Sequence, residues 1–265
     1  MTTGRVHNEG ADIVYDSVGQ GPILLMIPGG GGAGDAYAAI APILADKFTV
    51  VSYDRRARSR SAGDRNRDLD MAQQARDAAA VIRAMGAERA YVFGNSGGAS
   101  VGLKLAEDHP EIITALIVHE PPVFAILPNA EKELSFVDAV HAKFLSEGLL
   151  PALQIFMSSL VGFDANGPMI GQRLDPADAQ FFMAHEYLNL SRYKPDLDAI
   201  RRSKVPIVAL AGDKSADASY ARTARVLAER LDCKYVEVPG NHMAFMIEPG
   251  PFAAALREIL RDLQR

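Results

Sequence analysis

The sequence predicts an α/β fold in which a mostly parallel, doubly wound sheet carries an inserted helical segment. Short apolar runs, typical of buried strands, alternate with segments whose apolar residues recur at helical spacing. This alternation stops over residues 123–195 and resumes at residue 196. A chain of 265 residues is long enough to bury the core of such a fold. We therefore expect a core made of residues 1–122 and 196–265, and a helical cap made of residues 123–195.

The first half of the core follows the alternation in order. Residues 11–18 alternate apolar and polar side chains, as expected of an edge strand. Solid apolar runs, expected of central strands that are covered on both faces, lie at 23–27, 48–53, 91–93 and 114–118. Helical spacing is seen between these runs, at 37–44, 70–85 and 101–106.

The second half begins with the segment that lacks a strand signal. Residues 123–195 contain helical stretches broken by Gly and Pro and rich in Met, Phe and Leu. Strands are then expected at 206–211 and 234–238, with a helix at 218–231 between them and a last helix starting near Pro251. Because open α/β sheets bind ligands at the carboxyl ends of their strands, we expect residues 123–195 to cover that edge.

Composition excludes several classes of function. The net charge of −5 gives no electrostatic footprint for nucleic acid or an anionic membrane. No apolar run approaches membrane length, and residues 1–10 lack the apolar core of a signal peptide, so a cytoplasmic protein is expected. The single cysteine, Cys233, rules out an intramolecular disulfide, and no metal-binding spacing of histidines occurs. We expect no cofactor and no metal; the oligomeric state stays open, a homodimer included.

The strongest local signal is the sequence Gly94-Asn-Ser96-Gly-Gly98. It follows a predicted buried strand and opens a predicted helix, which is the context of a nucleophile elbow. The chain must reverse so sharply there that the serine is forced into a strained backbone conformation, and only small residues at 94 and 98 leave room for it. Ser96 is the candidate nucleophile, with the amide of Gly97 behind it at the helix start.

Taken together, these stretches resemble the α/β-hydrolase superfamily over nearly the whole chain. The matching pieces are the glycine loop 28–32, Tyr53-Asp54-Arg55, residues 94–98, His109-Pro110 and Pro239-Gly-Asn-His242. The resemblance implies an α/β-hydrolase fold with the cap inserted after strand 6, and a nucleophile, acid and histidine in that chain order. It implies His242 as the base and Gly30 as the second amide of an oxyanion hole, beside Gly97. For His119, His141 and His185, substrate contact or a surface position is expected.

The acid is where the sequence departs from the common pattern. The superfamily usually carries Gly-x-x-Asp after the strand before the last, but this chain has Gly212-Asp-Lys-Ser215. Asp213 and Asp217 stand nearby at other offsets. Glu120 ends the preceding strand in a His-Glu-x-Pro string that is similar to zearalenone-type lactonases, which place the acid there. A glutamate at that position is costly to bury unless it is paired, and a histidine is a suitable partner. Glu120 is therefore the preferred acid, with Asp213 and Asp217 as alternatives.

Two other patterns admit rival interpretations. Gly29-x-Gly31-x-x-Gly34 formally matches a dinucleotide fingerprint, which would make the protein an oxidoreductase. Pro28 opens that loop and no Tyr-x-x-x-Lys pair occurs, so this interpretation is disfavoured. Arginines stand at positions 55, 56, 58 and 60. Such a run is expected to be a solvated turn with one arginine paired internally, and the alternative is an anion clamp.

The predicted function is hydrolysis of a carboxylic ester or lactone of a hydrophobic small molecule. Ser96 attacks, His242 transfers the proton and Glu120 orients the imidazole, while the Gly30 and Gly97 amides bind the oxyanion. A carbon–carbon bond hydrolase on the same triad, or a hydrolase-fold ligand receptor with slow turnover, stays as the alternative. Residues expected to contact the substrate are Pro122, Met157, Tyr187 and Met243.

Overall fold

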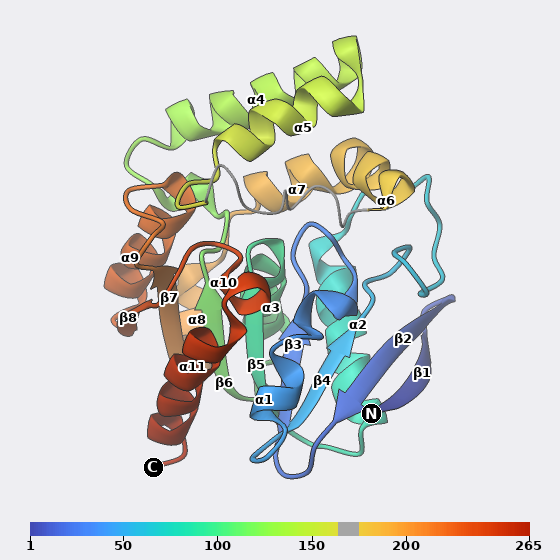
Figure 1. Cartoon of the computed structure of the whole chain (residues 1–265), viewed down its shortest axis with the longest axis vertical. Helices are drawn as coiled ribbons and strands as arrows, with labels where there is room; N and C mark the ends of the chain where they lie inside the picture. Colours follow the sequence, from blue (N-terminus) through green and yellow to red (C-terminus); the bar gives the residue numbers. More distant parts are fainter. Residues whose placement is uncertain (164–174) are drawn as a thin grey trace.

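The computed structural model describes residues 1–163 and 175–265, and its centre is one eight-stranded sheet (Figure 1). The strand order is β1-β2-β4-β3-β5-β6-β7-β8. The hairpin β1–β2 and the β2–β4 pair are antiparallel, and every other pair is parallel. The strands are β1 (Thr2–Asn8), β2 (Ala11–Val18), β3 (Ile23–Ile27), β4 (Thr49–Tyr53), β5 (Ala90–Asn95), β6 (Ile113–His119), β7 (Ile207–Gly212) and β8 (Lys234–Val238).

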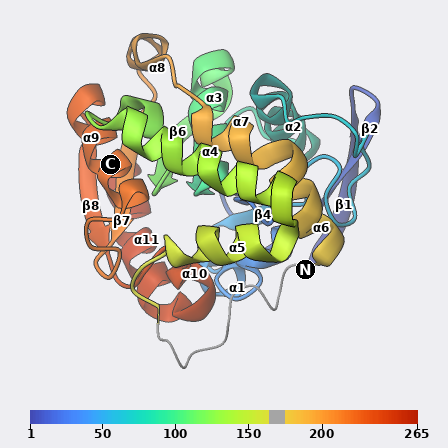
Figure 2. The same cartoon turned by 90° about the horizontal axis from the view of Figure 1, so that it is seen from above.

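Helices cover both faces of this sheet, so the fold is a three-layer α/β structure. One face carries α2 (Met71–Ala84), α3 (Gly97–Asp108), α8 (Leu197–Ser203) and α9 (Ser219–Leu231), and the other carries the short η1 (Gly34–Tyr37), α1 (Ala41–Leu44), α10 (Ala244–Ile247) and α11 (Pro249–Leu263). A short turn, η2 (Pro110–Ile112), leads into β6. Seen from above, the two helical layers lie on opposite sides of the sheet (Figure 2).

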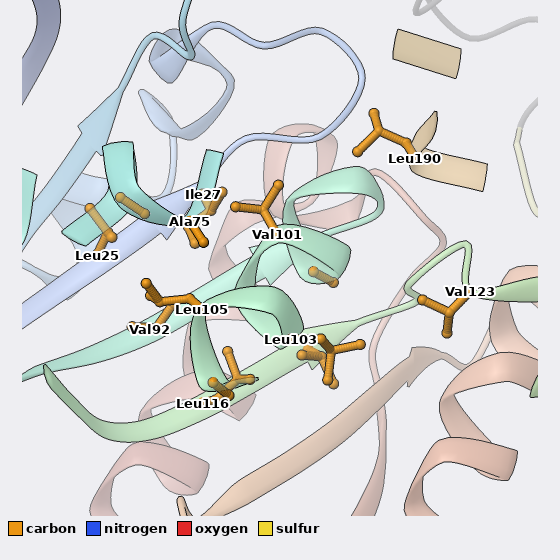
Figure 3. Close-up of a cluster of buried hydrophobic side chains, with 14 of the residues drawn as sticks. Leu25, Ile27, Ala75, Val92, Val101, Leu103, Leu105, Leu116, Val123 and Leu190 are labelled. Carbon is orange, nitrogen blue, oxygen red and sulfur yellow. The ribbon is translucent and has the colours of Figure 1, made fainter. Parts of the chain in front are cut away.

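The core consists of two apolar clusters, one on each side of the sheet. Leu25, Val92 and Leu116 pack with Ala75 and Leu103 on the α2 and α3 side (Figure 3). On the opposite face the alternate strand residues, such as Met26 and Phe93, pack against α1 and α11. Successive side chains of a strand point to opposite faces, so a strand covered on both faces must be apolar throughout. This explains the solid apolar runs of the sequence.

A helical layer lies over the carboxyl ends of the parallel strands, and we call it the cap (Figure 1). Its elements are η3 (Phe124–Ile126), α4 (Ala130–Glu147), α5 (Leu149–Ser158), α6 (Pro176–Phe181), the single π turn η5 (Phe182–Glu186) and α7 (Tyr187–Arg192). In the described parts of 123–195 there is no strand. Residues 164–174 of the predicted cap lie outside the described residues. Across the described chain, every helix is too short or too polar to span a bilayer.

Strand β1 is one strand more than the sequence analysis expects. Its sequence, Thr-Thr-Gly-Arg-Val-His-Asn, is polar, and its residues are exposed or half-buried. It pairs through its backbone with β2 along its whole length, from Thr2 to Asn8. The turn between them uses Gly10, whose φ of +79° suits glycine.

Candidate active site

Ser96 occupies the sharp turn between β5 and α3. Its backbone has φ 54° and ψ −126°, a conformation that costs free energy and persists only where the surroundings enforce it. The crossing is possible because two neighbours lack a Cβ atom. A Cβ on Gly94 would lie 2.4 Å from the Gly98 carbonyl oxygen, and one on Gly98 would lie 2.0 Å from the carbonyl oxygen of Ile27. The strain at Ser96 is thus imposed by close packing of three backbone segments.

Ser96 is only partly buried and lines a cavity of about 280 Å³ beneath the cap. His242, on the loop between β8 and α10, lines the same cavity. Among the hydrogen bonds of the described residues, none joins Ser96 Oγ to His242 Nε2. A nucleophile and its base are often farther apart in an unliganded site than in the substrate complex. Ser96 and His242 therefore line the same cavity but are not hydrogen-bonded to each other.

His242 is held by Glu120, which directly follows β6. Glu120 Oε2 lies 2.6 Å from His242 Nδ1, and Glu120 Oε1 accepts a hydrogen bond from the backbone N–H of Gly212 at 2.8 Å. The carboxylate is fully buried. Burial by itself would raise the pKa of Glu120, but the neighbouring imidazoles and the hydrogen bond from His242 outweigh it and bring the pKa to about 2. Glu120 is therefore an anion at neutral pH, suited to hold His242 with its Nδ1 proton facing the carboxylate.

The two alternative acids lie elsewhere. Asp213 Oδ1 accepts a hydrogen bond from the backbone N–H of Gly240 at 2.8 Å, so it ties two loops together. Asp217 is 81% exposed and faces Arg225. Of the three carboxylates that the sequence offers, the structure brings only Glu120 to His242.

His119 was expected at the surface or against the substrate, and that expectation is wrong. The side chain is fully buried between Phe93 and Phe252. Asn95 Nδ2 donates to His119 Nδ1 at 2.9 Å and to the backbone carbonyl of His242 at 3.1 Å. Burial lowers the pKa of His119 to about 4, so the ring is neutral at pH 7.

Since His119 Nδ1 accepts from Asn95, the proton of the neutral ring sits on Nε2. His119 Nε2 lies 3.8 Å from Glu120 Oε2 and has no hydrogen-bond partner among the described residues. The N–H dipole of His119 stabilises the negative charge on Glu120. Asn95 holds the backbone carbonyl of His242 by a hydrogen bond. Sequence inspection missed Asn95, although its position inside the elbow motif was a usable signal.

The residues expected to contact substrate all line the cavity: Pro122, Met157, Tyr187 and Met243. Three cap aromatics, Phe156, Phe182 and Tyr187, pack edge to face with ring centroids 5.6–5.8 Å apart. Gly30 and Gly97 line it as well. Their N–H groups make no backbone hydrogen bond within the described residues, so both donors are available to a ligand.

The arginine run is not a solvated turn with one internal pair, as its sequence suggested. Arg55 and Arg58 are fully buried, Arg56 pairs with Asp77, and Arg60 pairs with Asp54 and Asp16. The buried pair reaches Glu186 of the cap, which lies about 130 positions later in the chain. No local pattern connects positions so far apart, which is why the sequence did not show it.

A larger hollow, of about 430 Å³, opens at the amino-terminal ends of β7 and β8, between Lys204, Cys233 and Leu263. It contains neither Ser96 nor His242 and lies at the opposite edge of the sheet. Within the described residues, no group of three or more His, Cys, Asp or Glu side chains is arranged to hold a metal ion. The cavity with the elbow serine is therefore the candidate active site.

Comparison with known proteins identifies the family of this chain. A sequence profile described as the alpha/beta hydrolase fold matches residues 22–249. The chain belongs to the α/β hydrolase-fold family. It is 31% identical over 267 residues to YraK of Bacillus subtilis (strain 168), an uncharacterized hydrolase, covering 98% of this chain and 96% of that one.

Solved α/β hydrolases share the fold at low identity. A thermophilic esterase from Thermogutta terrifontis superposes with a TM-score of 0.82 at 19% identity, with full coverage of both chains. Est816, described as an enzyme that degrades N-acyl homoserine lactones, gives a TM-score of 0.76 at 18% identity and covers 96% of this chain and 99% of its own. These likenesses show that the fold is shared.

Proposed function

We propose that this α/β hydrolase cleaves a carboxylic ester or lactone of a hydrophobic small molecule through Ser96, His242 and Glu120. The observation that carries the proposal is the 2.6 Å contact between Glu120 Oε2 and His242 Nδ1 at a cavity that also contains the elbow serine. A buried carboxylate, an imidazole and a strained, accessible serine form the constellation that activates a hydroxyl nucleophile.

The reaction follows from which atoms face the cavity. Ser96 Oγ attacks the carbonyl carbon, and His242 Nε2 takes its proton while Glu120 stabilises the resulting imidazolium. The tetrahedral intermediate collapses with cleavage of the C–O bond, and His242 returns the proton to the departing alkoxide oxygen. Water, deprotonated by His242, then attacks the acyl-enzyme, and Ser96 leaves with the proton. A lactone follows the same steps, with both products joined in one hydroxy acid.

The oxyanion would be bound by the N–H groups of Gly30 and Gly97. Gly97 is the first residue of α3, so the amide and the helix N-terminus both favour negative charge there. Gly30 lies on the loop after β3 and also lines the cavity. One such donor is worth about 3 to 4 kcal/mol of transition-state stabilisation.

The volume and the lining of the cavity favour a substrate with a small, hydrophobic acyl or alkyl group. Its walls are mainly apolar and include Leu153, Phe156, Leu160, Leu190 and Met246. A volume of about 280 Å³ is at the lower end of small-molecule sites, which are usually about 300–1,000 Å³. The esterase and the lactone-degrading enzyme with the same fold act on the same class of carbonyl chemistry.

Hydrolysis of p-nitrophenyl esters of increasing acyl length, alongside aliphatic and aromatic lactones, tests this proposal. We expect turnover of short to medium acyl chains by the wild type and no turnover by Ser96→Ala. A fluorophosphonate probe should label the wild type and not the variant. An enzyme that is neither labelled nor active on any ester or lactone would contradict the proposal.

A further inference from the structure

The buried arginines of the 55–60 turn join the cap to the glycine loop of the core. Arg55 donates to both oxygens of Glu186, at 2.7 and 2.8 Å, and Arg58 Nη1 lies 3.5 Å from Glu186 Oε2. All three side chains are 0–1% exposed. Two guanidinium groups thus share one carboxylate in a buried site.

The same guanidiniums bind the carbonyl groups of the glycine loop. Arg55 Nη2 donates to the Gly29 carbonyl oxygen at 3.0 Å. Arg58 Nη2 donates to the carbonyl oxygens of Gly30 at 2.8 Å and Gly31 at 2.9 Å. Three consecutive peptide groups are therefore held through their oxygens by two side chains.

Fixing a carbonyl fixes the amide of the next residue. In a planar trans peptide the C=O and N–H bonds point in opposite directions. The bond to Gly29 O therefore turns the N–H of Gly30 away from Arg55, and the bond to Gly30 O turns the N–H of Gly31 away from Arg58. The loop is also shaped around Arg58, because a Cβ on Gly32, where φ is +71°, would lie 2.4 Å from Arg58 Nε.

We propose that Glu186 is a positioning residue through which the docked cap orients the Gly29–Gly31 loop and, with it, the oxyanion-binding N–H of Gly30. The inference rests on the proposed ester hydrolysis for its kinetic consequence, but the orientation of the loop is a property of the fold. Glu186 does not touch the substrate. It acts through Arg55 and Arg58, and Phe182, at the other end of the same π turn, packs against Gly30.

Charge explains why a carboxylate is needed at this place. Burial lowers the pKa of Arg58 to about 10, so its guanidinium remains a cation at neutral pH. Without Glu186 two adjacent buried cations would face each other, and the nearby carboxylate of Asp178 is already paired with Arg65, so the arrangement would be unfavourable. We expect at least one guanidinium to leave its position and release the loop carbonyls.

The test is Glu186→Gln, compared with Asp77→Asn. Asp77 is also fully buried and accepts two hydrogen bonds from an arginine, at 2.7 and 2.8 Å, but its partner Arg56 binds the backbone of Asn8 and Glu9 instead of the glycine loop. Glu186→Gln should lower kcat by about 10- to 100-fold with KM changed by less than about 3-fold, since an oxyanion donor is lost only in the transition state. Asp77→Asn should lower Tm comparably while kcat stays within about 2-fold of the wild type.

A second variant serves if Glu186→Gln does not fold. Arg55→Lys keeps a cation for Glu186, but a single ammonium group does not reproduce the fork that binds both Glu186 oxygens and the Gly29 carbonyl. It should show the same loss of kcat with a smaller fall in Tm than Glu186→Gln, since no buried charge is left unpaired. A kcat within about 2-fold of the wild type for Arg55→Lys, or an equal loss in Asp77→Asn, would overturn the proposal.

Hydrogen–deuterium exchange of the peptide covering residues 28–34 measures the loop without any activity. Exchange there should be faster in Glu186→Gln and unchanged in Asp77→Asn. If wild-type enzyme hydrolyses no ester and no probe labels Ser96, the proposed function fails, yet this comparison still decides the role of Glu186. Unaltered exchange in Glu186→Gln would sink the inference even in an active esterase.

Discussion

Replacing Glu120 with glutamine changes one atom of the site and has a predictable effect on His242. The backbone N–H of Gly212 faces the position of Glu120 Oε1 and only donates. The amide oxygen of the glutamine must therefore stay with Gly212, which leaves its NH₂ group 2.6 Å from His242 Nδ1. A donor at that position selects the imidazole tautomer whose proton is on Nε2, which cannot accept the proton of Ser96.

The magnitude follows from this reversal. In an enzyme where the triad acid becomes an amide, the wrong tautomer lowers kcat by about 10⁴-fold. We expect kcat of Glu120→Gln to fall by about 10³- to 10⁴-fold, equivalent to about 4 to 5.5 kcal/mol of transition-state stabilisation. The side chain keeps its size, so the cavity should keep its shape and KM should change little.

Steady-state hydrolysis of the best p-nitrophenyl ester, with Tm measured in parallel, provides the assay. Asp213→Asn and Asp217→Asn are the matched controls, because each makes the same chemical change at a carboxylate that does not contact His242. Both should stay within about 3-fold of wild-type kcat. Glu120→Gln within 10-fold of the wild type, or a 100-fold loss in either control, would refute the assignment of the acid.

Three further outcomes are expected. Ser96→Ala and His242→Ala should each abolish nearly all activity, and the double variant should be no worse than either single one, because the pair acts as a unit. The folded-state pKa of His119, about 4, lies below its ordinary value of 6.5. As the pH falls, His119 therefore binds its proton in the unfolded chain before it does so in the folded chain. The contribution of His119 to the free energy of unfolding should therefore fall by about 3 kcal/mol between pH 6.5 and 4. Urea titrations of His119→Gln should not show this fall. Met157→Ala and Tyr187→Phe should shift the preferred acyl length in the ester series more than they shift Tm; an unchanged preference would remove both from the substrate wall.

Local sequence patterns were sufficient for the elbow and for most of the sheet. A solid apolar run followed at once by Gly-x-Ser-x-Gly allows few backbone paths, and the structure has β5, Ser96 and α3 in that order. The contact between Glu120 and His242 could be predicted because a carboxylate at the end of a buried strand needs a partner. Strand β1 was not predicted, because its residues are exposed or half-buried and its sequence shows no alternation of apolar and polar residues.

The remainder depends on contacts between segments far apart in the chain. An arginine is ordinarily exposed. No residue near positions 55–60 indicates that Glu186 will pair with Arg55 and Arg58. His119 was expected against the substrate or at the surface, because the neighbours that enclose it, Phe93 and Phe252, come from β5 and α11. Three-dimensional packing decided these positions.

The contact between Glu186 and the core restricts which caps could replace the one in this protein. Because the proposed nucleophile, base and acid all lie in the core and the cap supplies much of the pocket wall, exchanging caps between relatives is an obvious route to new substrate preferences. A transplanted cap would have to bring a carboxylate to the place where Arg55 and Arg58 meet. Chimeras made without one would be expected to fail in chemistry as well as in recognition. A library that varies the cap should therefore hold Glu186 and its π turn constant and diversify α4 and α5.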